Sequence, residues 1–261
     1  EMDLPEVLEM ANFEKMESIR KRVEESVDNP EIAEALKPWY ALFCKRPCFD
    51  DEYLPTFNRE NVDLIDTGGL GVEKITPNGV VVAGQEYEVD CIIFATGFEV
   101  GTGYERRAGC EVIGADGRTL TEKWDEHGVS TLHGLQTSGY PNHFMLSANQ
   151  GAFTVNFPHL LEEAARNAVC IIKHVVDEGY LTVDVEQEAE DEWVKTIIEK
   201  TRGPIGAGPG STECTPGYYN NEGHLNEKAR QGAPYGGGSV EFFKLMEDWR
   251  DKGDFKGLEF N

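Results

Sequence analysis

Two short stretches of the chain combine residue types that could handle a charged ligand. The first is Asp90–Gly97, DCIIFATG, in which a continuous apolar run ends in the small residues Ala95, Thr96 and Gly97. Small residues let a backbone approach a ligand closely, and open α/β sheets bind ligands beyond the carboxyl ends of their strands. We therefore predict that Ala95, Thr96 and Gly97 contact a cofactor. An ordinary turn between a strand and a loop remains the alternative on spacing alone.

The second stretch is the basic pair Lys45-Arg46. A fixed cation in a water-poor pocket stabilises negative charge that develops during a reaction, and a guanidinium stays charged there. Without further context, a Lys-Arg pair is usually part of the solvated surface. The neighbouring Asp50, Asp51 and Glu52 are interpreted as a solvated edge, because adjacent acids seldom form a general-base site.

A third candidate, Asn149-Gln150-Gly151, follows the apolar run Phe144–Leu146 and precedes a helix expected to begin near Pro158. Backbone amides and the dipole at a helix N-terminus stabilise negative charge on a ligand. We therefore predict that Asn149, Gln150 and Gly151 contact a cofactor. A routine loop between a strand and a helix is the alternative.

Helices are predicted where apolar residues recur at three- and four-residue steps among polar neighbours. This pattern marks residues 13–23, 158–175 and 189–198. An Asn-Pro pair is typical of a helix start, so a further short helix is expected over Pro30–Leu36. From Gly203 onward the chain is rich in glycine and proline, and we expect this tail to cover an existing surface instead of forming a core.

Strands are predicted from short apolar and β-branched runs. Val62–Ile65 is expected to be a short strand, and Cys91–Ala95 and Phe144–Leu146 suit parallel strands that are buried on both faces. Asn78-Gly79 favours a tight hairpin, which Gly79–Val82 would continue. The sequence thus predicts an α/β protein with parallel strands, antiparallel hairpins and a C-terminal extension.

Composition and charge exclude several function classes. The formal net charge of -24 repels phosphate polymers and anionic membrane surfaces, so neither nucleic acid nor a membrane is an expected partner. No leader and no long uncharged apolar run occurs, which favours a soluble, cytoplasmic protein. The six cysteines form no C-x-x-C pair and the six histidines no H-E-x-x-H motif, so neither a disulfide framework nor a metal site is expected. We assign no chemistry to Cys44 and Cys48, although they flank the basic pair.

The DxxxxATG pattern of Asp90–Gly97 resembles a motif of flavin-containing monooxygenases and their Baeyer-Villiger relatives. KRPCFDDEYLPTFNRENVDLID, GRTLTEKW and GYPNHFMLS also resemble that family's C-terminal half, in the family's order, from about residue 10 to 225. The resemblance implies two Rossmann-like domains, one for FAD and one for NADPH. It implies that residues 1–47 end the NADP-binding domain, that 48–180 form the second half of the FAD-binding domain, and that 181–261 lie over the active site.

The resemblance also implies residue roles. Arg46 would stabilise the anionic oxygen intermediate that forms on the flavin, and Lys45 would help to recognise the phosphate of NADPH. Thr215 and Tyr218, within CTPGYYNNEG, stand where relatives carry a loop over nicotinamide and substrate. Several relatives have a tryptophan there, which leaves the substrate's shape open, and a segment wrapping the surface is an equal alternative.

The implied activity is the NADPH- and O2-dependent Baeyer-Villiger oxidation of ketones to esters or lactones. No G-x-G-x-x-G lies between a predicted strand and helix, so the chain alone is not expected to hold FAD, and a missing N-terminal half of the same enzyme is the expected partner. The alternatives are an N- or S-oxygenating flavin monooxygenase, a flavin reductase, or a non-catalytic module that needs a separate FAD-binding chain. The resemblance links Lys45-Arg46 and the long tail to ketone oxygenation and not to the oxygenation of nitrogen or sulfur.

Overall fold

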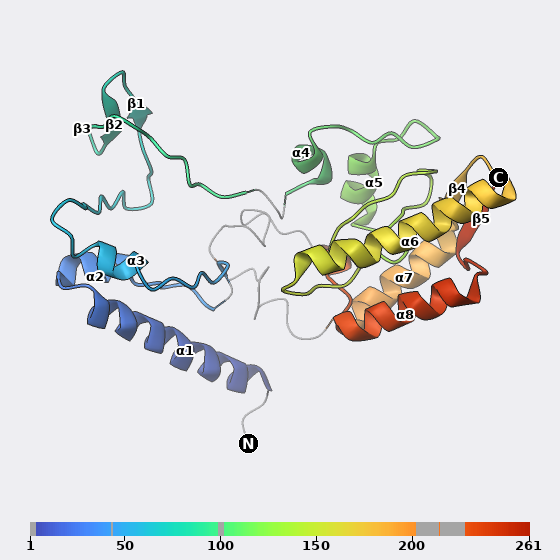
Figure 1. Ribbon diagram of the computed structural model, residues 1–261, viewed down its shortest axis with the longest axis horizontal. Coiled ribbons are helices and arrows are strands. Elements are labelled where there is room, and N and C mark those ends of the chain that lie inside the picture. Colours follow the sequence, from blue (N-terminus) through green and yellow to red (C-terminus); the bar gives the residue numbers. More distant parts are fainter. Residues whose placement is uncertain (1–3, 43, 99–101, 202–213, 215–227) are drawn as a thin grey trace. The chain divides into compact units, whose positions relative to one another are not determined.

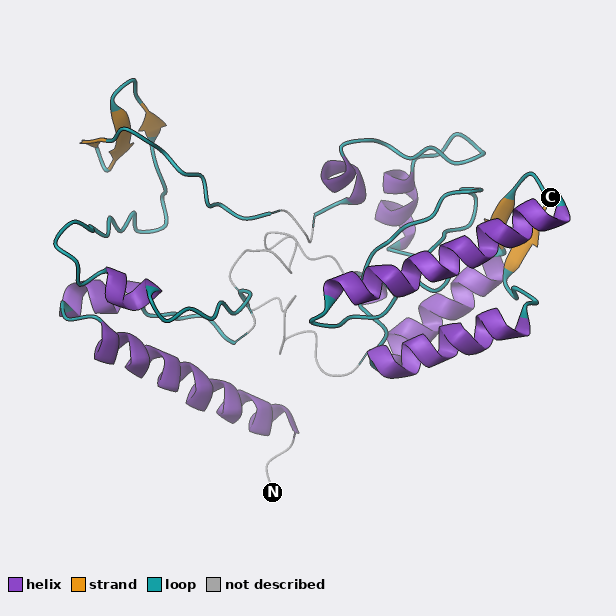
Figure 2. Ribbon diagram, viewed as in Figure 1, coloured by secondary structure: helices purple, strands orange, loops and turns teal. Residues whose placement is uncertain are grey.

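The structure is a computed structural model that divides into two compact units (Figure 1). It describes residues 4–42, 44–98, 102–201, 214 and 228–261. Unit 1 comprises residues 1–101 and 206–223, and unit 2 comprises residues 102–205 and 224–261. Both units contain helices and short strands (Figure 2). No helix among the described residues is long and apolar enough to cross a membrane.

Unit 1 is built on a long first helix, α1 (Leu4–Ser26), which contacts α2 (Pro30–Leu36) and α3 (Tyr53–Thr56). The side chains buried between these helices are Val23, Val27 and Ala33, with Ile32, Leu36, Leu54 and Phe57 packed against them. Asn29 caps α2, because its Oδ1 accepts hydrogen bonds from two backbone amides of the first turn. The two helices predicted for this region are therefore confirmed.

The strands of unit 1 form a small antiparallel sheet, β1 (Lys74–Ile75), β2 (Gly79–Val82) and β3 (Gln85–Glu88). The turn between β1 and β2 contains Asn78, so the predicted hairpin is confirmed. A Cβ atom at Gly79 would lie 1.9 Å from the carbonyl oxygen of Tyr87, which explains why glycine begins this strand.

The parallel strands predicted from the apolar runs are absent from the described residues, where every paired strand is antiparallel. Cys91–Ala95 has no strand partner, and the side chains of Ile93 and Phe94 are 85% and 72% exposed. Val62–Ile65 and Phe144–Leu146 also lie outside the strands. These predictions were wrong for this chain, because a buried parallel strand needs neighbouring strands that its described residues do not supply.

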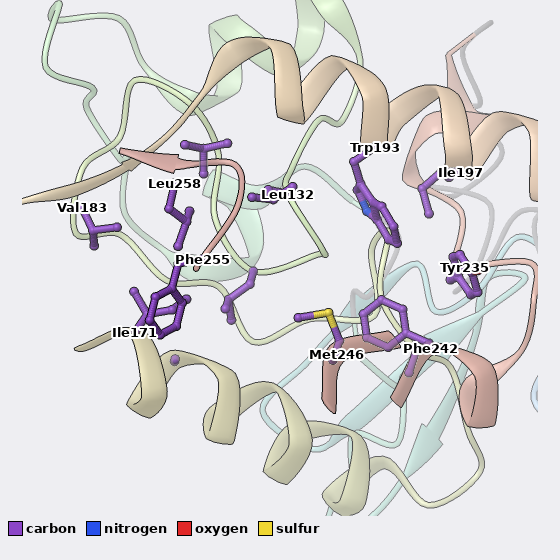
Figure 3. Close-up of a cluster of buried hydrophobic side chains, with 14 of the residues drawn as sticks. Leu132, Ile171, Val183, Trp193, Ile197, Tyr235, Phe242, Met246, Phe255 and Leu258 are labelled. Carbon is purple, nitrogen blue, oxygen red and sulfur yellow. The ribbon is translucent and has the colours of Figure 1, made fainter. Parts of the chain in front are cut away.

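Unit 2 places three helices around one large core (Figure 3). These are α6 (Phe157–Glu178), α7 (Gln187–Lys200) and α8 (Ser239–Lys252). The remaining elements are α4 (Tyr104–Ala108), α5 (Leu120–His127), a 3-10 turn (Ala229–Gly232) and the antiparallel pair β4 (Val183–Val185) and β5 (Leu258–Phe260). The predictions of α6 and α7 are confirmed, and Gly179, with φ +78°, ends α6 as a left-handed cap.

The tail contributes to this core, contrary to the prediction that it covers a surface. Its buried side chains are Tyr235, Phe242, Met246, Phe255 and Leu258. The rings of Trp193 and Tyr235 stack with centroids 5.6 Å apart. The spacing of Phe242, Met246 and Trp249 is that of an apolar helix face, but the surrounding glycines and charges obscure it in the sequence.

One buried ion pair joins two helices of unit 2. The Lys123 ammonium on α5 lies 2.8 Å from Oε1 of Glu190 on α7, and Glu190 is 0% exposed. Lys123 Nζ donates hydrogen bonds to Thr137 Oγ1 at 3.0 Å and Ser138 O at 2.8 Å. Glu190 Oε2 accepts from Thr137 Oγ1 at 2.9 Å and from the Ser138 amide at 2.6 Å. Glu190 Oε1 has no hydrogen-bond partner among the described residues, so Lys123 and Glu190 form an ion pair while both donate to or accept from the Thr137-Ser138 turn.

Candidate functional site

Lys45 and Arg46 lie in an irregular stretch between α2 and α3, residues 38–51, which we call the basic segment. Lys45 is half-buried and Arg46 is exposed. The Arg46 guanidinium makes no ion pair or hydrogen bond with the residues that the structure describes. A guanidinium carries a planar set of donors that suits an anionic ligand, and no described residue occupies those of Arg46.

Side chains of α1 fix the basic segment at several points. Asn12 Oδ1 accepts from the Leu42 amide at 2.7 Å, Arg20 Nη1 donates to Pro38 O at 3.0 Å, and Arg22 Nη2 pairs with Asp51 Oδ1 at 2.9 Å. The Arg20 guanidinium also lies 4.8 Å from the centroid of the Trp39 ring, a cation–π contact. These contacts fix the backbone of the segment at described residues on both sides of residue 43, and these residues belong to no helix or strand.

The acidic residues beside the basic pair have a local structural role. Asp50 Oδ1 accepts hydrogen bonds from the amides of Glu52 and Tyr53 at 2.8 and 2.6 Å, at the start of α3. Asp50, Asp51 and Glu52 are all exposed. This arrangement agrees with the interpretation of a solvated edge.

Cys44, the residue before Lys45, forms a disulfide with Cys214. The two cysteines are 4% and 9% exposed, and Cys48, Cys91, Cys110 and Cys170 are free. The spacing of the cysteines predicts no disulfide framework, and it does not reveal this single bond. The partners are 170 residues apart, so only the tertiary structure brings them together and no local spacing in the sequence could indicate the bond.

The turn Ala95-Thr96-Gly97 lies in unit 1 and is exposed throughout. Gly97 has φ +87°, in the left-handed region that favours glycine, and no atom lies within 4 Å of the position of a Cβ. The backbone here is open to close approach. Contact with a cofactor stays a prediction, and Thr215 and Tyr218 lie outside the described residues.

Asn149-Gln150-Gly151 forms a single turn of unit 2, with Gln150 fully buried at its centre. Gln150 Oε1 accepts from Thr131 Oγ1 at 2.6 Å, and Nε2 donates to the carbonyl oxygens of Val129 and Gln231, each at 2.8 Å. Its side-chain amide is therefore used within the protein. Gln150 thus positions the turn, Gly151 is buried as well, and only Asn149, which is half-buried, keeps contact with solvent.

Comparison with known proteins identifies relatives along nearly the whole chain, although no protein-family model matches it. The chain is 46% identical over 259 residues to neopentalenolactone D synthase of Streptomyces avermitilis, covering 98% of this chain and 43% of that protein. It is 46% identical over 257 residues to an FAD-binding monooxygenase of Hypomyces subiculosus, covering 98% and 42%. It is 41% identical over 263 residues to Baeyer-Villiger monooxygenase 4 of Dietzia sp., covering 99% and 42%.

Solved structures agree with these relatives. Polycyclic ketone monooxygenase from the fungus Thermothelomyces thermophila matches with a TM-score of 0.83 and 35% identity, over 96% of this chain and 40% of that chain. A steroid monooxygenase bound to NADP matches with a TM-score of 0.76 and 27% identity, over 96% and 46%. The chain belongs to the Baeyer-Villiger monooxygenase family. The predicted class, a partial FAD- and NAD(P)-binding α/β flavoprotein, is confirmed.

The chain corresponds to a C-terminal part of a Baeyer-Villiger monooxygenase and spans 43% of the length of the first relative named above. Lys45, Arg46 and the Ala95–Gly97 turn lie in unit 1, whereas the Asn149–Gly151 turn lies in unit 2. All of these residues are among those that the structure describes.

The start of α6 combines a helix N-terminus with exposed apolar side chains. The 22-residue helix begins five residues after the buried Ala152, and Asn156 Oδ1 accepts from the His159 amide at 3.3 Å. Phe153, Val155 and Phe157 are exposed around this helix start. A flat ring system that carries negative charge can lie against such apolar side chains while the helix dipole faces its charge.

A histidine next to the Gln150 turn is held in its neutral form. The His133 ring lies 4.8 Å from that of Trp193 and 5.4 Å from that of Trp249, measured between centroids. The ring keeps partial contact with solvent, yet the protein surrounds most of it, and this burial lowers the pKa of His133 to about 4. His133 therefore adds no positive charge to unit 2 near pH 7.

Sequence reasoning missed Gly134, which has φ +73° and supports the Asn149–Gly151 turn. A Cβ atom there would lie 2.6 Å from Asn149 O and 3.0 Å from Gly151 N. We expect Gly134→Ala to lower the free energy of unfolding of the complete enzyme by about 2 kcal/mol or more, because it adds a backbone clash to an unfavourable φ angle. Urea denaturation followed by circular dichroism would measure the loss.

Gly139→Ala is the matched control for this substitution. Gly139 has φ +86°, but no atom lies within 4 Å of its Cβ position, so only the backbone strain is added there. The Gly139 variant should lose clearly less stability than the Gly134 variant. Equal losses would contradict the tight packing of Gly134 against the turn.

Proposed function

We propose that the complete protein is an FAD- and NADPH-dependent monooxygenase that uses O2 to convert ketones into esters or lactones. The homology to Baeyer-Villiger monooxygenases along nearly all of the chain supports this proposal. The observation that carries it is Arg46, an exposed guanidinium on a segment that α1 fixes in place. Baeyer-Villiger oxidation develops negative charge on oxygen, which a fixed cation stabilises.

The residues present fit these cofactors. When bound, FAD supplies the activation of O2, and NADPH supplies the hydride that reduces the flavin. The apolar side chains at the start of α6 would contact the flavin ring, and the backbone of Ala95–Gly97 would approach the cofactor closely. Lys45 would bind the phosphate of NADPH, while Arg46 would place its positive charge at the reacting oxygen. Thr215 and Tyr218 are proposed to contact the substrate.

The exposed run Cys91–Phe94 supports the proposal that this chain needs the N-terminal half of the enzyme to form the FAD-binding domain. Ile93 and Phe94 expose large apolar side chains that a folded enzyme normally covers. We propose that the missing N-terminal half supplies strands beside this run and carries the G-x-G-x-x-G turn for the pyrophosphate of FAD. The other partners would be a small ketone and O2, and a cytoplasmic location stays a prediction.

Expression of this chain alone, beside co-expression with the N-terminal part of the enzyme, tests the proposal. We expect the chain alone to purify without flavin, and the pair to be yellow, to oxidise NADPH in response to a ketone and to form an ester. Flavin absorbance and mass spectrometry of the product measure this. Stoichiometric FAD on the chain alone would contradict the need for the missing part. Oxygenation of only amines or sulfides, or no oxygenated product, would replace ketone oxidation with one of the alternatives.

A further inference from the structure

The Cys44–Cys214 disulfide fixes the basic segment immediately before its two cations. The described hydrogen bonds and ion pair from α1 reach the segment at Pro38, Leu42, Asp50 and Asp51, on either side of Lys45-Arg46. Cys44 lies between these points, where its amide donates to Ala41 O at 3.0 Å and its sulfur is bonded to Cys214. The disulfide therefore restrains the backbone next to Lys45 from inside the segment.

A covalent bond at this position affects Arg46 more directly than a contact elsewhere in unit 1 would. Only Lys45 separates Cys44 from Arg46 in the chain, so a shift of the Cys44 backbone would displace the Arg46 backbone, from which the guanidinium extends. The bond also closes a loop of 170 residues, and crosslinks across long loops remove much conformational freedom. Correct placement of a catalytic group within about 1 Å can decide the rate of a reaction.

We infer, on the basis of the proposed function, that Cys44 and Cys214 are redox-sensitive positioning residues for Arg46, and that opening their disulfide uncouples NADPH oxidation from ketone oxygenation. A dithiol would donate two electrons and two protons, the S–S bond would break, and the dithiol would itself become a disulfide. Disulfides in cytoplasmic proteins are usually transient and redox-sensing. The bond would thus let the thiol redox state of the compartment set the yield of ester.

Uncoupling has a measurable product. With Arg46 displaced, the enzyme would still oxidise NADPH, and NADPH, O2 and a proton would give NADP⁺ and hydrogen peroxide in place of an ester. The ratio of ester to NADPH consumed therefore reports the position of Arg46. A purely structural role for the disulfide would lower stability or flavin content and leave this ratio unchanged.

The test uses the complete enzyme with Cys214→Ser, and Cys48→Ser as the matched control, because Cys48 is an exposed free thiol two residues beyond Arg46. Peptide mapping without reductant should find Cys44 linked to Cys214 in the wild type and in Cys48→Ser. Cys214→Ser should retain FAD, release more hydrogen peroxide, and form about tenfold less ester per NADPH. Dithiothreitol should have the same effect on the wild type and none on Cys214→Ser.

Two results would overturn the inference: the absence of the linked peptide in the oxidised wild type, or a coupling ratio that neither dithiothreitol nor Cys214→Ser changes. Failure of the proposed function gives a different result. In that case the oxidised wild type forms no ester from any ketone, while peptide mapping still reports whether the disulfide exists. The two failures are therefore distinguishable in one set of samples.

Discussion

Arg46→Ala in the complete enzyme is expected to lower ester formation about 100- to 1,000-fold, the range found when a preorganised group that stabilises transition-state charge is removed. Flavin content should remain close to that of the wild type, because Arg46 is exposed and its guanidinium makes no described contact that supports the fold. Chromatography of the ester, flavin absorbance and a peroxide assay on the same preparation measure the three quantities.

Two further variants separate the role of Arg46 from a general effect of charge. Arg46→Lys keeps the charge but loses the planar, two-pronged donor geometry, so it should recover only part of the activity. Arg166→Ala removes one positive charge from an exposed site on α6 that pairs with Glu162 and Glu163, and it should form ester at the wild-type rate. Ester formation by Arg46→Ala at the wild-type rate would refute the assignment.

The sequence predicted those elements whose stability is decided locally. α6 has a capping asparagine, a proline in its first turn and a glycine at its end, so all its signals lie within one stretch of chain. The hairpin at β2 likewise depends on one turn. The prediction of a strand over Cys91–Ala95 was wrong. A strand forms only beside a partner strand, and the described residues supply none for this run.

The residues of the candidate site were likewise predicted only where a local motif marks them. Motifs in the chain indicated Lys45-Arg46 and the Asn149–Gly151 turn, and the structure gives both a fixed backbone. The means of fixing them could not be predicted, because they depend on residues distant in sequence: Asn12 and Cys214 for the first, and Gly134 for the second. The sequence pattern predicted that Gln150 contacts a ligand. In the structure, its buried side chain instead makes hydrogen bonds that hold the turn together.

Glu190→Ala should cause the largest loss of stability among single substitutions in unit 2. It leaves the Lys123 ammonium, which is 8% exposed, without its counter-ion, and it removes the acceptor for the Thr137 hydroxyl and the Ser138 amide. Breaking a buried pair from one side costs about 3–5 kcal/mol. Urea denaturation of the complete enzyme, followed by circular dichroism, would measure the decrease. Glu188→Ala, which removes an exposed acid from the first turn of the same helix, is the control and should change the midpoint little.

A double variant distinguishes the destabilisation caused by an unpaired buried charge from the contribution of the ion pair to the free energy of unfolding. Lys123→Met with Glu190→Leu removes both charges and retains most of the side-chain volume, so it should be more stable than Glu190→Ala. The Thr137 hydroxyl and the Ser138 amide would still lack the acceptor that Glu190 provides, so the recovery should be incomplete. If the double variant were as unstable as Glu190→Ala, the lost hydrogen bonds, and not the stranded ammonium, would account for the destabilisation. That result would make Glu190 chiefly an acceptor for the Thr137-Ser138 turn.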